Sequence, residues 1–272
     1  MSIFLIYLAV GLCAGILSGL LGLGGGVVIV PMLIVVFSTL GFSMEVLTHM
    51  AIGTSLATIL ATSLSSIYSH HQQKNICWGV LPWLVPGVAV GAIFGAVFAT
   101  VVSGVMLQIM FGCFLIFMAL QMMVVRKSIH EEQQTIAQGQ LTGVGVGVGV
   151  GAVSAAFGIG GGSLTVPYLS YRGIEMRQAV GSSAVCGAPI ALFGTLTYIL
   201  SGWHSPLLPE GSLGYIYWPA WLGIIIVSTP AARLGAKLAG ITNERNLKRL
   251  FAVVLLLLGL RFIWVNAVIH LI

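Results

Sequence analysis

The apolar residues of this chain are gathered in long runs that short polar segments separate. Residues 1–44, 75–125 and 178–209 contain no charged side chain at all. Each run exceeds the roughly 20 apolar residues that a helix needs to cross a bilayer. The pattern therefore predicts helices that span a membrane.

Breaks within these runs divide the chain into ten predicted helices, five in each half. They cover about residues 3–22, 26–39, 46–69, 79–101 and 104–125, then 141–158, 162–171, 176–200, 215–236 and 246–269. The second helix of each half reaches only ~15–20 Å, which is short of the ~30 Å hydrocarbon core. The sequence leaves open whether these short helices cross fully. We favour a re-entrant hairpin in each half, with its tip near the middle of the membrane.

The second half of the chain repeats motifs of the first half. Gly-Leu-Gly-Gly-Gly at 22–26 returns as Gly-Ile-Gly-Gly-Gly at 158–162, and a proline follows each copy, at Pro31 and Pro167. Ala-Ile-Gly-Thr-Ser at 51–55 returns as Ala-Val-Gly-Ser-Ser at 179–183. The polar stretch between the copies separates a first repeat, 1–125, from a second, 141–272, and 126–140 is the predicted linker.

An odd number of segments per half predicts that the two repeats have opposite orientations in the membrane. Basic residues give an independent test, because they concentrate at cytoplasmic ends of spans. With the linker in the cytoplasm and both termini outside, Arg261 is the one basic residue that does not fall at a cytoplasmic end. The other ten are Lys74, Arg126, Lys127, Arg172, Arg177, Arg233, Lys237, Arg245, Lys248 and Arg249. The predicted fold is an all-α polytopic membrane protein with two inverted repeats and both termini outside the cytoplasm.

Composition excludes several other classes. Hydrophobic residues make up 58% of the chain and charged residues 6%, and aspartate is absent. The N-terminus lacks the basic leader of a removable signal, and the four cysteines have neither disulfide nor metal spacing. Neither glycine cluster is followed by Lys-Ser or Lys-Thr, as a nucleotide-binding loop would be. The net charge of +5 reflects loop residues that set orientation, so no nucleic-acid partner, cofactor or metal is expected.

The paired glycine clusters are the main candidates for a binding site. A chain that reverses inside a membrane needs glycine's conformational freedom, and the helix that follows begins with N–H groups that lack internal partners. Such helix starts attract an anion without burying a full positive charge. The predicted tip residues are Gly24, Gly25 and Gly26, with Gly160, Gly161 and Gly162. A third glycine-rich stretch, 143–151, instead suggests close packing between helices.

Hydroxyl side chains of the second motif are further candidates. Thr54, Ser55, Ser182 and Ser183 would donate to the oxygens of an anion, and two inverted copies would gather them around one central point. Alternatively, they pack or bond a carbonyl one turn earlier. His49 and Arg177 occupy equivalent positions and are possible charge partners, although Arg177 also suits an anchor at the cytoplasmic surface.

These paired motifs resemble those of the TauE/SafE sulfite exporter family. The resemblance covers nearly the whole chain, because both halves carry both motifs in order. The signature maps onto Gly24, Gly25, Gly26, Pro31, Gly53, Thr54 and Ser55, and onto Gly160, Gly161, Gly162, Pro167, Gly181, Ser182 and Ser183. Ser182 stands where the first half has Thr54. The resemblance implies an inner-membrane permease for sulfur-containing anions: sulfite, an organosulfonate such as sulfoacetate, or thiosulfate.

The leading hypothesis is therefore a secondary transporter, and more specifically an exporter, that moves a small sulfur-containing anion by alternating access. An uncoupled anion channel is the first alternative. An intramembrane enzyme or an accessory subunit is a weaker one, because no catalytic cluster recurs in the spans. The substrate, the direction, a coupling proton or sodium ion, and the oligomeric state do not follow from the sequence.

Overall fold

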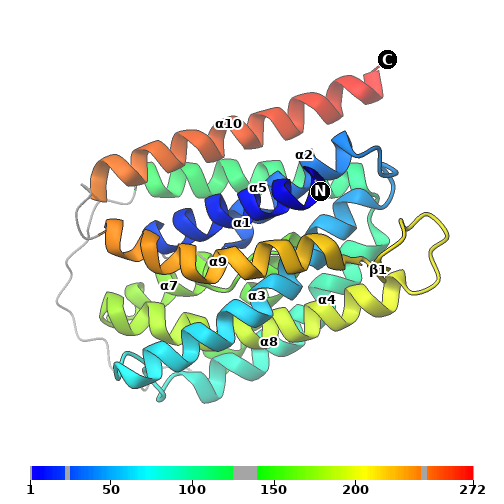
Figure 1. The fold of residues 1–272 in the computed structure, drawn as a ribbon. Coiled ribbons are helices and arrows are strands. Elements are labelled where there is room, and N and C mark those ends of the chain that lie inside the picture. Colours follow the sequence, from blue (N-terminus) through cyan, green and yellow to red (C-terminus); the bar gives the residue numbers. More distant parts are fainter. Residues whose placement is uncertain (1, 22–24, 125–139, 240–243, 272) are drawn as a thin grey trace.

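The computed structural model describes residues 2–21, 25–124, 140–239 and 244–271, and these form a helical bundle (Figure 1). The helices of the first half are α1 (Ser2–Leu21), α2 (Gly26–Thr39), α3 (Leu47–Gln72), α4 (Leu81–Val101) and α5 (Gly104–Val124). Those of the second half are α6 (Gln140–Phe157), α7 (Gly162–Tyr171), α8 (Met176–Gly202), α9 (Trp218–Ala239) and α10 (Glu244–Leu271). The all-α prediction is confirmed.

The apolar runs give helices of membrane-spanning length. Within the described residues, four helices are long and apolar enough to cross a bilayer: α3, α4, residues Gly104–Met123 of α5, and α8. Large apolar side chains are exposed along them, among them Phe94, Val101 and Leu200. Because this pattern puts apolar surface where a soluble protein would have polar side chains, it identifies a multi-pass membrane protein.

One predicted boundary is wrong. The ninth helix was expected to begin near residue 215, but a small hairpin occupies that place. Strand β1 (Ser212–Leu213) pairs antiparallel with β2 (Ile216–Tyr217), and α9 begins only at Trp218. Gly211 and Gly214 have positive φ angles of 84° and 55°. Glycine adopts these angles at little cost, so the turn forms where the apolar pattern alone suggested helix.

Helices of the two halves are interleaved. Helix α1 packs mainly on α9, α4 on α6, α3 on α8, and α5 on α10. The first helix of each half thus packs on the fourth helix of the other half. The third helix of one half packs on the third helix of the other, and the fifth packs on the fifth. Neither half buries its apolar surface by itself.

Contacts at glycines show in which relative direction the paired helices run and how closely they approach. A Cβ built on Gly53 would lie 3.2 Å from Tyr198 Cβ, and one on Gly181 would lie 3.3 Å from His70 Cβ. Residue numbers therefore rise along α3 as they fall along α8. Helix α5 pairs in the same antiparallel way with α10, since Gly112 lies against Ile263 and Gly259 against Ile116. The third helices of the two halves therefore run in opposite directions, and so do the fifth helices.

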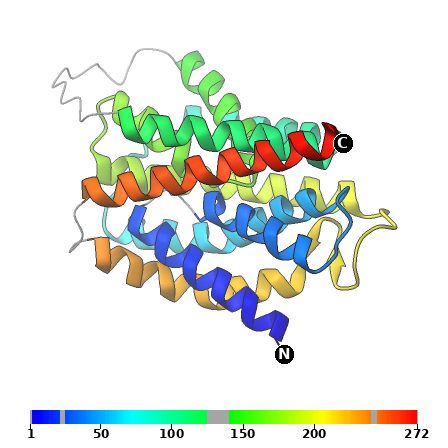
Figure 2. The same ribbon diagram turned by 90° about the horizontal axis from the view of Figure 1, so that it is seen from above.

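Helices α4 and α6 run parallel and approach at their backbones. A Cβ on Gly87, Gly91 or Gly95 would meet the carbonyl oxygens of Val144, Val148 and Ala152, respectively. The glycine-rich stretch 143–151 therefore serves close helix packing, as expected from the sequence. Helix α1 begins and α10 ends at the same end of the bundle (Figures 1 and 2).

Candidate functional site: two helix breaks that meet in the bundle

The second glycine cluster interrupts the helix between α6 and α7. Gly158 has a φ of 67°, and the Ile159 N–H donates to the Ser154 carbonyl at 2.8 Å. This is a Schellman C-cap, in which a left-handed glycine ends the helix and satisfies a free carbonyl. Three residues later the chain re-enters a helix, with Gly161 as its N-cap. The Thr165 N–H donates to the Gly161 carbonyl at 2.8 Å.

The first cluster has an equivalent place between α1 and α2. Helix α1 ends at Leu21 and α2 begins at Gly26, with Gly25 as N-cap; the Ile29 N–H donates to the Gly25 carbonyl at 2.9 Å. Gly24, a predicted site residue, lies outside the described residues. Gly25, Gly26, Gly160, Gly161 and Gly162 are all found at the breaks.

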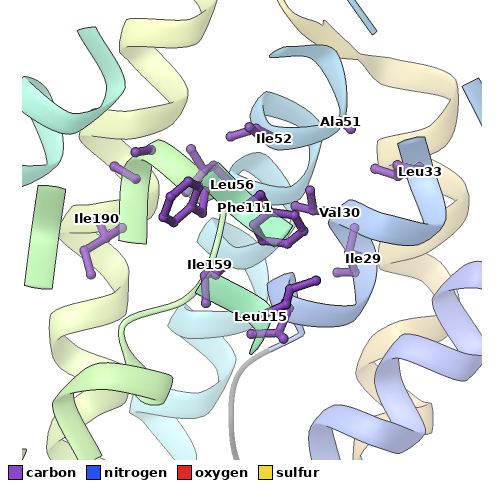
Figure 3. Packing of buried hydrophobic residues seen from close by; sticks show 14 of the residues in the cluster. Ile29, Val30, Leu33, Ala51, Ile52, Leu56, Phe111, Leu115, Ile159 and Ile190 are labelled. Atoms are coloured by element: carbon purple, nitrogen blue, oxygen red, sulfur yellow. The ribbon is translucent and has the colours of Figure 1, made fainter. Parts of the chain in front are cut away.

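The two breaks lie against each other in the bundle. A Cβ built on Gly26 would meet the Gly158 carbonyl oxygen and would lie 2.9 Å from Ile159 Cα. Figure 3 shows Ile159 between Ile29 and Val30 of α2 on one side and Ile190 of α8 on the other. Gly158–Gly161 are buried, as is Gly26. The start of α2, from one half, therefore lies against the turn between α6 and α7, from the other half, inside the protein.

Ser55 connects the breaks to α3. Its buried hydroxyl donates to the Gly158 carbonyl oxygen at 2.8 Å. A Cβ on Gly158 would lie 3.0 Å from both Ile52 Cα and Val30 Cγ2, so α3 and α2 enclose this turn. Of the four predicted hydroxyls, the contacts of Ser55 place it directly at the second break.

Thr54 and Ser182 instead hold the segments that lead into α9 and α4. The Tyr217 N–H donates to Thr54 Oγ1 at 3.0 Å, and the Cys77 N–H donates to Ser182 Oγ at 2.9 Å. The adjacent glycines allow this approach: a Cβ on Gly53 would lie 2.8 Å from the Tyr215 carbonyl oxygen, and one on Gly181 would meet the Asn75 carbonyl oxygen. The two motifs perform the same packing role in each half.

The four hydroxyls do not converge on one point. Gly181 faces His70, which is seventeen residues along α3 from Gly53. At ~1.5 Å per residue the two motifs lie about 25 Å apart along the α3–α8 pair. Ser183 bonds the Val180 carbonyl of its own helix at 2.8 Å. The two motifs are far apart because α3 packs antiparallel on α8, which places equivalent residues at opposite ends of this helix pair.

The two possible charge partners also lie away from the breaks. His49 is buried; its Nε2 lies 3.0 Å from the Ala99 carbonyl oxygen and its Nδ1 lies 3.1 Å from that of Glu45. Its ring is 5.2 Å from that of Tyr215, whose pKa is raised by burial. His49 thus ties α3 to α4 and the hairpin. Arg177 is exposed at the start of α8.

Sequence reasoning missed several buried polar side chains. At the second break they are Ser154, Ser163 and Thr165. Ser154 occupies the repeat position of Ser18, four residues before each glycine cluster, and this is the available signal. A separate buried network joins α3, α5 and α10: Gln108 Nε2 donates to Thr48 Oγ1 at 2.7 Å, and Asn266 Nδ2 donates to Gln108 Oε1 at 2.9 Å. No repeat or motif marks this network.

The chemistry available at the breaks is that of backbone amides and hydroxyls. Within the described residues, no group of three or more His, Cys, Asp or Glu side chains is placed to hold a metal ion. Helix starts carry a partial positive charge. An arrangement of this kind is suited to an anion with several acceptor oxygens and poorly suited to a bare cation.

Multi-pass helical architecture and buried, broken helices define the class as a membrane transporter, and comparisons with known proteins agree. The sequence model described as sulfite exporter TauE/SafE matches residues 7–262. The chain belongs to the TauE/SafE sulfite exporter family and is a membrane transporter, not an enzyme.

Curated relatives cover almost the full chain. A probable membrane transporter protein of Haemophilus influenzae is 38% identical over 260 residues, covering 95% of this chain and 97% of that protein. The probable membrane transporter protein YunE of Bacillus subtilis is 27% identical and covers 96% of this chain and 97% of its own length. A probable membrane transporter protein of Methanocaldococcus jannaschii is 27% identical, with 92% of each chain covered. No solved structure matches this chain significantly.

Proposed function

We propose that this protein is a secondary transporter that exports a small sulfur-containing oxyanion, such as sulfite, sulfoacetate or another organosulfonate, or thiosulfate, by alternating access. The observation that carries the proposal is the contact between the two helix breaks at Gly26 and Gly158, next to which α2 and α7 begin. Helix starts that converge from two repeats supply an anion site near the middle of a membrane. The family's description as sulfite exporters favours sulfur anions and export.

The packing of the halves supports a rocking mechanism. Helices α1 and α9 form one parallel pair, α4 and α6 form another, and each pair combines both halves. The equivalent helices α3 and α8 run in opposite directions, as do α5 and α10, which supports the proposal of two inverted repeats. If the two pairs tilt as units about the α3–α8 core, the glycine breaks would face first one side and then the other.

Transport measurements in proteoliposomes test this proposal. We expect sulfite efflux that saturates with concentration and is faster than in liposomes without protein, because a carrier must bind each ion before it moves. Sulfoacetate and thiosulfate should compete if they share the site. Flux that stays linear in concentration, together with single-channel currents, would support a pore instead. Absence of flux for all three anions would contradict the proposed substrate class.

Topology is tested separately by cysteine labelling. In a background without the four native cysteines, Glu131→Cys in the linker and Glu210→Cys near β1 should react from opposite faces of the membrane. The orientation that we propose has the linker in the cytoplasm and both termini in the periplasm of a bacterial inner membrane. Labelling of both positions from the same face would refute the inverted repeats. This assay reports topology only and does not test which anion is transported.

A further inference from the structure

The two breaks differ in the side chains that surround them. Relative to the glycine clusters, Ser163 and Thr165 at the start of α7 occupy the positions of Val27 and Ile29 at the start of α2. All four are buried. Both helix starts have a glycine as N-cap, but at these positions the second presents hydroxyls where the first presents hydrocarbon.

Thr165 lies against the helix start and has no hydrogen-bond partner. Its side chain is 0% exposed, and its hydroxyl is unpaired. A Cβ built on Gly161 would lie 3.4 Å from Thr165 Oγ1 and 3.5 Å from the Gly187 nitrogen of α8. The hydroxyl therefore lies beside Gly161, between α7 and α8, where the built Cβ would also lie 3.0 Å from Ile190 Cδ1, the mobile end of a side chain.

Two serines add hydroxyls to the same break. Ser154, on the last turn of α6, is 1% exposed and its hydroxyl is also unpaired. Ser163 makes only a long contact, 3.5 Å, with the Gly160 carbonyl oxygen. A buried hydroxyl without a partner destabilises the fold. By contrast, the buried hydroxyl of Thr58 donates to the Thr54 carbonyl at 2.9 Å.

We infer that the transported anion is held asymmetrically, with its oxygens on the second break. Thr165 is the substrate-contacting side chain, and Ser163 and Ser154 belong to the same hydroxyl-lined subsite. The hydroxyls donate to the anion's oxygens, and the α7 helix start provides the favourable dipole. The first break closes the site with the apolar side chains of Val27 and Ile29. This inference rests on the proposed transport of an oxyanion and assigns the residues that bind it.

Replacing Thr165 with valine separates a binding role from a structural one. Valine keeps the shape of threonine but removes the unpaired hydroxyl. The ligand-free variant in detergent should therefore melt at the same temperature as the wild type or higher. Its affinity for sulfite, measured by the sulfite-dependent rise in melting temperature, should fall by about ten- to a hundredfold, as expected for one lost hydrogen bond to a charged group. Thr165→Ser keeps a hydroxyl at this position, so this variant should retain most of the sulfite affinity of the wild type.

Ser228→Ala is the matched control. Ser228 on α9 also carries a buried, unpaired hydroxyl, but it packs beside Gly15 of α1, away from the breaks. Its loss should leave sulfite affinity unchanged. Wild-type sulfite affinity in Thr165→Val, or a large fall in the melting temperature of that variant without ligand, would overturn the inference and leave the transporter proposal intact. A wild-type protein that responds to neither sulfite, thiosulfate nor sulfoacetate would overturn the proposed function itself.

Discussion

Gly26→Ala is expected to abolish sulfite flux. The added methyl group would meet the Gly158 carbonyl oxygen and would lie 2.9 Å from Ile159 Cα, both of which are backbone atoms. Backbone held between α2 and α3 cannot move aside as the end of a side chain can. The two breaks would have to separate, which disrupts the site and costs about 1–3 kcal/mol of stability. Flux in proteoliposomes and thermal stability in detergent are the two measurements.

Gly25→Ala is the matched control for this change. A Cβ on Gly25 would lie 3.2 Å from Ile29 Cδ1, the mobile end of a side chain, and Gly25 has an ordinary helical φ of −63°. We expect this variant to keep measurable flux and a melting temperature close to that of the wild type. Equal loss of flux in both variants would mean that glycine matters at the first break for a reason other than contact with Gly158.

Gly151→Ala is expected to weaken the packing of the two halves more than any other single methyl group in α6. A Cβ there would meet the Val88 carbonyl oxygen and would lie 2.9 Å from the Ala92 nitrogen. The α4–α6 pair would have to open along its length, because glycine contacts recur on successive turns. We expect a loss of about 1–3 kcal/mol and a smaller yield of monodisperse protein in size-exclusion chromatography.

Gly149→Ala, two residues earlier in the same helix, should have the opposite effect. A Cβ on Gly149 meets nothing within 4 Å of it, and alanine is the better helix former by about 1 kcal/mol. Its melting temperature should equal or exceed that of the wild type. If both variants lost stability equally, the glycines of 143–151 would be needed for helix flexibility and not for the contact with α4.

The interleaving of the halves has a consequence for how the transporter can move. Each half contributes its first helix to a pair with the fourth helix of the other, so the halves cannot move as two separate bodies. The units that we propose to move are the mixed pairs α1–α9 and α4–α6, which pack on α3–α8. Thr54 and Ser182 link this central pair to the starts of α9 and α4 through the Tyr217 and Cys77 amides.

The sequence by itself determined the class of protein, the positions of its helices and the two breaks. Apolar runs specify helices because a membrane leaves the backbone few other ways to satisfy its polar groups. A triple glycine followed by proline predicts a helix break in each half, and this prediction needs no knowledge of how the halves pack. The extra hairpin before α9 escaped prediction because its strands are only two residues long, and Gly211 and Gly214 also suit a membrane helix.

Only the tertiary structure decided which of the repeated residues come together. In sequence, Thr54 and Ser182 are as well marked as the glycine clusters, and the hydroxyls and the two helix starts were expected around one point. Antiparallel packing of α3 on α8 carries the two hydroxyl motifs to opposite ends, whereas the folded chain brings Gly26 against Gly158. It also leaves the hydroxyl of Thr165 buried and unpaired, which no motif indicates. A sequence repeat shows which residues of the two halves are equivalent. Whether equivalent residues lie close together depends on how the two halves pack.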